Sequence, residues 1–260
     1  MLEEELAFAR QVADEADRIA LSFFGSDPAV RLKPDRTPVT EADERIEAMV
    51  RARLAQRFPQ DAILGEEEGS LGTGDRRWVL DPIDGTKNFV DGVQVWATLL
   101  ALEEDGVPVL GIVSAPALGE RYEAVRGEGA RMNGARIHVS QADRISRAFV
   151  CFASVDAWLD DPHGEPLLEI VREARRNRGF GDFWGHVLVA RGAADVMFEP
   201  SLATWDYAAC RVVVEEGGGR MTRFDGSALQ HRDSVLSTNG RLHEEIVARL
   251  VHGRRLDRSP

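Results

Sequence analysis

Cysteine, long apolar runs and positive charge are all scarce in this sequence. Its two cysteines, Cys151 and Cys210, show no paired spacing typical of a zinc site or a redox motif. No apolar run approaches the ~18 residues that are needed to cross a bilayer. The acidic start, Met1–Glu5, lacks the basic and apolar regions of a signal peptide. These absences predict a cytoplasmic protein with reduced thiols and without membrane contact.

Negative charge, in contrast, is abundant. The 260 residues include 44 Asp and Glu against 32 Lys and Arg, which gives a net charge of −12. Such a chain repels a phosphate backbone, so the balance disfavours general nucleic-acid binding. The hydrophobic fraction of 43% is typical of a globular protein, and the length allows one large domain or two of about 100–150 residues. The open question is whether some of the surplus carboxylates converge on one site.

The N-terminal half shows helical and then strand-like periodicity. Apolar residues at three- and four-residue spacing predict a helix over residues 2–24, and Thr40 with Asp43 predicts a capped helix that runs to about Arg57. Strand-like runs follow at residues 97–102, 107–113 and 121–125. We therefore predict an N-terminal α+β domain over residues 1–144.

From about residue 145, short strands alternate with helices, a pattern typical of an α/β domain. Predicted strands lie at residues 149–152, 196–198 and 235–236. Predicted helices lie at residues 165–177, after Gly181, at 205–216 with Thr204 as the cap, and at 242–250. We therefore predict a second, C-terminal α/β domain over residues 145–260.

Four short segments place acidic residues beside turn-forming or capping residues: 39–43, 65–69, 81–89 and 204–209. In the third, Asp81 follows an apolar strand at residues 78–80 that Pro82 is expected to end, and Asp84 comes three residues after Asp81. Two carboxylates and the Ile83 carbonyl are oxygen ligands without Cys or His, which suits Mg²⁺. Taken singly, segment 81–89 is equally explained as a turn. A helix cap and a solvated acidic run are the favoured explanations of segments 39–43 and 65–69, and segment 204–209 is also explained as a helix cap with a first-turn acid.

All four segments together resemble the inositol monophosphatase family. Residues 81–89 (DPIDGTKNF) are similar to its first signature and residues 205–209 (WDYAA) to its second, while residues 65–67 and 39–43 match two further family segments in the same order. The resemblance implies a five-layer αβαβα sandwich, classed as α+β or α/β, and hydrolysis of a phosphate monoester by water with two to three Mg²⁺ ions per site. It also implies a homodimer and inhibition by lithium.

The resemblance also implies roles for individual residues. Glu66, Asp81 and the Ile83 carbonyl would hold one ion, and Asp81, Asp84 and Asp206 a second. Asp43 would position a third ion, and Glu66 with Thr86 would orient the attacking water. The amides of Gly85 and Thr86 would bind phosphate oxygens. Lys33 is similar in position to a lysine of the family's mobile loop, although this loop is one residue shorter.

Two further acids bear on the substrate. Asp182, in the segment GFGDFWGH at residues 179–186, resembles the histidinol-phosphatase branch of the family, and Glu199 lies seven residues before Asp206, where the family has a substrate-contacting acid. A pair of carboxylates favours a cationic substrate. We therefore expect L-histidinol phosphate, a metabolite of histidine biosynthesis, to be the substrate. Asp182 is alternatively a helix cap, and His186 is expected to be structural.

The competing hypotheses are an inositol-1-phosphatase, a broad sugar or nucleotide phosphatase of the same family, and a non-catalytic interaction protein. The complete set of acids disfavours the last of these. A small phosphorylated metabolite is accordingly the expected ligand, and neither nucleic acid nor a membrane is expected as a partner.

Overall fold

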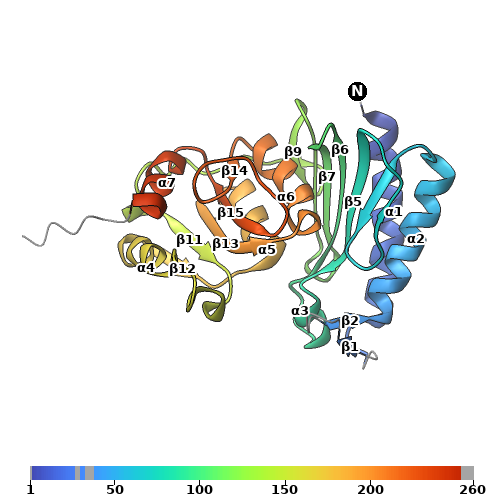
Figure 1. The fold of residues 1–260 in the computed structure, drawn as a ribbon, viewed down its shortest axis with the longest axis horizontal. Helices are drawn as coiled ribbons and strands as arrows, with labels where there is room; N and C mark the ends of the chain where they lie inside the picture. Colours follow the sequence, from blue (N-terminus) through green and yellow to red (C-terminus); the bar gives the residue numbers. More distant parts are fainter. Residues whose placement is uncertain (1, 27–29, 33–37, 253–260) are drawn as a thin grey trace, which may run out of the picture.

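A computed structural model describes residues 2–26, 30–32 and 38–252 of the chain (Figure 1). Lys33 therefore lies outside the described residues. Within these residues two large β-sheets lie side by side, and helices cover both outer faces and fill the space between them (Figure 1). The chain thus has the predicted five layers in the order αβαβα.

The first layer is a pair of helices, α1 (Glu3–Phe23) and α2 (Glu41–Arg57). Both predicted helices are confirmed, and so is the cap of the second. The Thr40 hydroxyl accepts a hydrogen bond from the Ala42 amide at 3.2 Å, and the Asp43 carboxylate accepts one from the Thr40 amide at 2.8 Å. Ile46, Val50 and Leu54 form the buried stripe of α2 against the sheet.

The second layer is an eight-stranded sheet with the order β10-β9-β8-β7-β6-β5-β3-β4. Its strands are β3 (Ala62–Gly65), β4 (Gly69–Leu71), β5 (Arg76–Asp84), β6 (Ala97–Glu104), β7 (Val107–Ala115), β8 (Glu120–Val125), β9 (Gly129–Met132) and β10 (Ala135–Arg136). All neighbours are antiparallel except β3 and β5, which are parallel. A separate two-stranded ribbon joins β1 (Val30–Leu32) to β2 (Pro38–Thr40).

The fourth layer is a mixed five-stranded sheet with the order β12-β11-β13-β15-β14. Its strands are β11 (Phe149–Phe152), β12 (Arg176–Arg178), β13 (Val196–Leu202), β14 (Arg220–Thr222) and β15 (Asp233–Thr238). The predicted helix at 165–177 is too long. Helix α4 (Gly164–Glu173) ends early because residues 176–178 pair with β11 as a parallel edge strand.

The remaining helices complete the layers. The third layer, between the two large sheets, consists of α5 (Asp182–Ala190) and α6 (Thr204–Glu216) (Figure 1). The fifth layer consists of α4 and α7 (His243–His252), which cover the outer face of the five-stranded sheet (Figure 1). The short α3 (Thr86–Val90) follows β5. Three 3₁₀ turns lie at Pro116–Leu118, Ile145–Arg147 and Val155–Trp158. None of the helices in the described ranges is long and apolar enough to span a bilayer.

His186 is a buried residue of α5 that contacts the five-stranded sheet. Its side chain is buried, and its Nδ1 lies 2.7 Å from the Ser237 hydroxyl of β15. This is the structural role that the sequence predicted. Burial lowers the pKa of the imidazole from 6.5 to about 3, because the interior disfavours the charged ring.

The buried His186 makes a contribution to stability that is sensitive to acid. Above pH 6.5 the ring is neutral in both states, but below it the unfolded chain takes up a proton that the folded chain refuses until about pH 3. The contribution of His186 to the unfolding free energy therefore falls with the pH, by about 2 kcal/mol at pH 5. Between pH 7.5 and pH 5, in urea titrations with EDTA, we expect the unfolding free energy of wild type to fall by about 2 kcal/mol relative to that of His186→Asn. Equal changes in wild type and variant would contradict this assignment.

Candidate active site

The end of strand β5 positions the first two carboxylates of the site. The predicted break at Pro82 is wrong, because the strand continues to Asp84 with a bulge: Asp81 pairs with Leu99 and Asp84 with Ala97 of β6. In a regular strand, residues three apart point to opposite faces. The extra residue of the bulge brings Asp81 and Asp84 to the same side, and the Thr98 hydroxyl holds the Pro82 carbonyl there at 2.8 Å.

Helix α6 supplies the third carboxylate from the other half of the chain. The cap prediction for Thr204 is wrong: α6 begins at Thr204, Ala203 is the N-cap, and the Asp206 carboxylate accepts the Ala203 amide at 2.7 Å. This bond anchors Asp206 in the first turn. One oxygen each from Asp81, Asp84 and Asp206 lies within 4.8 Å of the others.

Glu66 and Asp43 flank this cluster. Glu66 follows β3 at the end where β3 pairs with β5, and its amide donates to the Leu80 carbonyl at 3.2 Å. Asp43 is fully buried in the first turn of α2. Its Oδ2 is held by the amide and hydroxyl of Thr40, at 2.8 and 2.6 Å, while Oδ1 has no hydrogen-bond partner among the described residues.

The carboxylates open into a cavity of about 440 Å³. Eight of the predicted site residues line it: Glu66, Asp81, Ile83, Asp84, Gly85, Thr86, Asp182 and Asp206. Two predicted residues, Asp43 and Glu199, are buried and are not among its lining residues. Nine lining residues had been given no role: Pro38, Lys87, Asn88, Ser154, Ser201, Leu202, Ala203, Trp205 and Arg232.

Electrostatic repulsion dominates the floor of the cavity. The pKa of Asp81 is raised well above its ordinary value by burial and then by Glu66, Asp84 and Asp206. The pKa of Asp84 is likewise raised by burial and then by Asp182 and Asp206. Burial, assisted by Glu66, raises the pKa of Asp43 to about 6. These acids are therefore costly to ionise together unless a cation joins them.

The donor set fits hard divalent cations. All the candidate ligands are oxygens. Asp81 Oδ1, like Asp43 Oδ1, is buried and has no hydrogen-bond partner in the described ranges. Buried carboxylate oxygens without donors are rare in folded proteins and call for an explanation such as an ion. The acidic cluster of Asp81, Asp84 and Asp206 could therefore hold a divalent cation.

The turn after β5 shapes the wall beside the acids. Gly85 has a φ of 81°, a conformation that favours glycine, and a Cβ there would lie 3.0 Å from the Val95 carbonyl. This turn lets the Thr86 hydroxyl donate to the Ile83 carbonyl at 2.9 Å. The predicted metal-ligand carbonyl and the predicted water-orienting hydroxyl are therefore direct neighbours.

Asp182 lies against this turn rather than at the far end of the cavity. A Cβ placed on Gly85 would be only 3.6 Å from Asp182 Oδ2. The side chain does not cap α5: Gly181 is the N-cap without a side-chain bond, and Asp84 instead accepts the Phe183 amide at 2.7 Å. The alternative reading of Asp182 as a cap is therefore wrong, and its carboxylate faces the cavity.

Glu199 supports Asp182 from behind. Its Oε1 accepts a hydrogen bond from the Asp182 amide at 3.1 Å. Asp182 has a left-handed φ of 56°, a backbone conformation that few residues other than glycine adopt. Burial, followed by the charge of Asp182, raises the pKa of Glu199 well above its ordinary value. Asp182, which lines the cavity, is therefore backed by a second, buried carboxylate, and the two charges repel each other.

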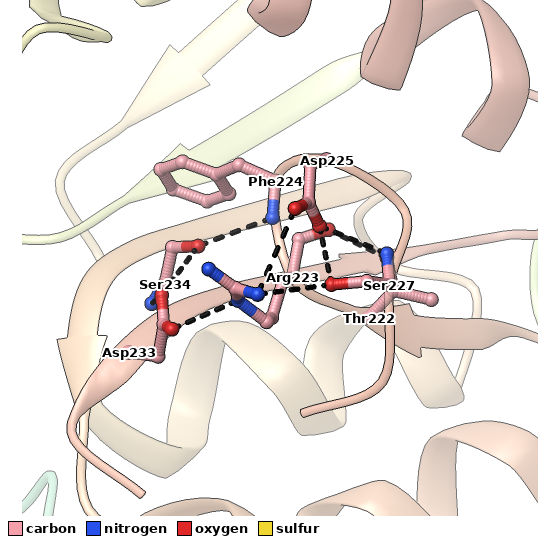
Figure 2. A network of polar contacts seen from close by, with 7 residues as sticks. All are labelled: Thr222, Arg223, Phe224, Asp225, Ser227, Asp233 and Ser234. Carbon is pink, nitrogen blue, oxygen red and sulfur yellow. Dashed lines mark hydrogen bonds and ion pairs between the residues drawn. The ribbon is translucent and has the colours of Figure 1, made fainter. Parts of the chain in front are cut away.

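Arg232 reaches the cavity from a loop that contains no recognised motif. Figure 2 shows the polar network that braces this loop between β14 and β15. Arg223 pairs with Asp233 at 2.8 Å, Ser234 accepts the Phe224 amide at 3.1 Å, and Asp225 accepts the Ser227 amide at 2.9 Å (Figure 2). The Arg232 amide then donates to the Leu202 carbonyl at 2.8 Å. Sequence reasoning missed Arg232 because only this tertiary scaffold places it.

Comparisons with known proteins bear on the family and the fold of the chain. The profile described as the inositol monophosphatase family matches residues 1–254. A histidinol-phosphatase of Mycobacterium tuberculosis is 45% identical over 97% of this chain and 100% of its own length, and one of Streptomyces coelicolor is 44% identical over 95% and 97%. The solved structure of an inositol monophosphatase from Zymomonas mobilis superposes with a TM-score of 0.86 at 33% identity, covering 96% of this chain and 98% of that one.

Proposed function

This chain belongs to the inositol monophosphatase family, and we propose that it is a metal-dependent histidinol-phosphatase that hydrolyses L-histidinol phosphate to L-histidinol and phosphate. The observation that carries the substrate assignment is the Asp182 carboxylate, which lies against Gly85 beside the oxygen cluster. The two histidinol-phosphatases, 44–45% identical over nearly their whole length, support it.

In this proposal the acids form two overlapping ligand sets, and one further acid lies outside them. Glu66, Asp81 and the Ile83 carbonyl would hold one Mg²⁺, Asp81, Asp84 and Asp206 would hold a second, and the buried Asp43 would help to position a third. When bound, Mg²⁺ neutralises the phosphate charge and makes water a better nucleophile. The role of the protein carboxylates is therefore to hold the metal ions, and they do not attack the ester themselves.

The turn between β5 and α3 handles the phosphate and the water. The amides of Gly85 and Thr86 donate to phosphate oxygens, and Glu66 with Thr86 orients the attacking water. The left-handed Gly85 is what allows the backbone, rather than a side chain, to approach the phosphate. No covalent nucleophile is required, since water attacks the phosphorus directly.

Substrate recognition follows from the short distance between the two charged groups of histidinol phosphate. Its ammonium group is borne on the carbon next to the ester methylene, so it stays close to the bound phosphate. A carboxylate that lies beside the phosphate turn, as that of Asp182 does, is placed to receive it through a charge-assisted hydrogen bond. Glu199 adds negative charge from behind. The ring of inositol phosphate carries hydroxyls only and gains less from this arrangement.

The proposal predicts a clear substrate preference. With saturating Mg²⁺, kcat/KM for L-histidinol phosphate is expected to exceed that for inositol 1-phosphate by at least about tenfold, the effect of one charge-assisted hydrogen bond. Phosphate release from both esters, and from fructose 1,6-bisphosphate and a nucleotide monophosphate, measures it. An equal or higher kcat/KM for inositol 1-phosphate would overturn the histidinol assignment and favour the inositol-phosphatase alternative.

The oligomeric state and the number of bound ions are further parts of this proposal. The homodimer, the two to three ions per site, the inhibition by lithium and the cytoplasmic location all stay predictions from family resemblance. A small phosphorylated metabolite is the ligand that the family implies.

A further inference from the structure

Helix α2 carries a buried ion pair one turn beyond Asp43. Asp43, Glu47 and Arg51 follow each other at four-residue spacing, so they share one face of the helix. Glu47 is 0% exposed and Arg51 only 8%. The Arg51 guanidinium donates twice to Glu47 Oε1, at 2.8 and 2.7 Å. Burying an ion pair costs desolvation free energy that hydrophobic residues of similar volume would not require. This cost indicates that the Glu47–Arg51 pair has a specific role.

The pair binds the backbone of the loop that carries Glu66. Glu47 Oε2 accepts the amide of Glu67 at 2.9 Å, and Oε1 accepts the amide of Glu68 at 3.0 Å. Arg51 donates to the Gly69 carbonyl at 2.5 Å. The three residues that follow Glu66 are therefore fastened through their backbones to one buried pair.

Gly65, the residue before Glu66, packs closely against the Glu47 carboxylate. A Cβ on Gly65 would lie 2.1 Å from Glu47 Oε1, so only glycine lets β3 come this close to the pair. Glu66 itself is tied to β5 through its amide. The peptide units on both sides of Glu66 thus abut Glu47, while the Glu66 side chain lines the cavity.

We propose that Glu47 is a positioning residue that directs the Glu66 carboxylate into the active site, with Arg51 compensating its buried charge. This inference rests on the proposed function, in which Glu66 holds metal and orients water. A carboxylate suits the task because its two oxygens accept diverging amides at once, and charged acceptors make the stronger hydrogen bonds. Partners that orient metal ligands are worth about 10- to 100-fold in metal affinity or activity.

Glu47→Gln tests the role with little change of volume. The glutamine oxygen can replace Oε1, but its NH₂ group then faces the amide of Glu67, the peptide directly after Glu66. We expect kcat for histidinol phosphate to fall about 10- to 100-fold and the Mg²⁺ dissociation constant from calorimetry to rise by a similar factor. KM at saturating Mg²⁺ is expected to change less than about threefold, because the phosphate and ammonium contacts remain.

Glu103→Gln is the matched control. Glu103 is also a buried glutamate, 3% exposed, that accepts two bonds from one arginine, Arg77, at 3.0 and 2.5 Å. It lies on β6 away from the cavity lining. We expect its substitution to lower Tm without altering kcat or Mg²⁺ affinity. If Glu47→Gln does not fold, Glu47→Asp keeps the charge but withdraws it from the loop, and the same loss of Mg²⁺ affinity is expected.

The outcomes separate the two proposals. Wild type that neither binds Mg²⁺ nor hydrolyses histidinol phosphate contradicts the proposed function. Wild type that does both, together with a folded Glu47→Gln or Glu47→Asp variant whose kcat and Mg²⁺ affinity match those of Glu103→Gln, contradicts the positioning role alone.

Discussion

Asp81→Asn is expected to abolish phosphatase activity and yet to make the metal-free protein more resistant to heat. Asp81 belongs to both proposed ligand sets, and metal contributes several kcal/mol to the transition state, so we expect kcat/KM to fall about 10³-fold or more. EDTA is expected to do the same to wild type. Activity that persists in excess EDTA would overturn the metal-dependent mechanism outright.

The opposite effect on stability follows from the charges in the cluster. Burial and three neighbouring acids raise the pKa of Asp81, so the folded protein holds a proton that the unfolded chain releases as the pH rises. The metal-free protein is therefore least stable above that raised pKa. Asparagine removes the charge, and we expect a higher Tm than wild type at pH 7.5 in EDTA.

Mg²⁺ reverses the order of stability. Because an ion that binds only the folded state stabilises it, Mg²⁺ is expected to raise the Tm of wild type far more than that of Asp81→Asn. Asp195→Asn is the control: Asp195 is a buried carboxylate that accepts the Phe149 amide at 2.6 Å and a bond from Ser140, and it does not line the cavity. Its Mg²⁺ response and kcat are expected to match wild type. Equal Mg²⁺ shifts in wild type and Asp81→Asn would contradict the proposed ligand set.

Asp182→Asn is expected to remove the preference for histidinol phosphate. A charge-assisted hydrogen bond to the substrate ammonium is worth about 1.5–3 kcal/mol, so KM for histidinol phosphate is expected to rise about 10- to 100-fold. KM for inositol 1-phosphate is expected to change less than about threefold. Asparagine is the appropriate replacement because Asp182 has a φ of 56°, a region that Asn adopts readily and Ala does not.

The proximity of Asp182 to the metal ligands requires a second measurement. The charge of Asp182 raises the pKa of Asp84, so its removal also alters the field at the cluster. Mg²⁺ affinity by calorimetry separates the two effects: an unchanged affinity with a selective rise in KM supports ammonium recognition. Equal rises in KM for both esters would show instead that Asp182 acts on the phosphate or the metal.

Local sequence signals identified most of the site because the chemistry is concentrated in short segments. Asp81, Asp84, Gly85 and Thr86 lie within six residues, and the turn that joins them is readable from Pro82 and Gly85. The capping box of α2 is equally local. Resemblance to the family then supplied the fold, and the matching profile and solved structure confirm it.

The same local reasoning failed where neighbours in space overrode the pattern. Pro82 was expected to end a strand, yet pairing with β6 absorbs it in a bulge. Thr204 was expected to cap α6, yet its amide and hydroxyl adjoin His231, and Asp206 caps the helix at Ala203. Glu47 went unnoticed, although an acid on the buried stripe of a helix, four residues before an arginine, is a signal that could have been read.

The sequence by itself, with the family resemblance, indicated which groups could bind metal, because oxygen ligands, their turn residues and their order along the chain are properties of local segments. Only the tertiary structure decided how they converge. The β5 bulge turns Asp81 and Asp84 to one side, the packing of α6 between the sheets brings in Asp206, and the start of α5 sets Asp182 against Gly85. These positions depend on packing between parts of the chain that are far apart in the sequence. The bond from Phe183 to Asp84, for example, joins residues 99 positions apart, and no local pattern encodes such a contact.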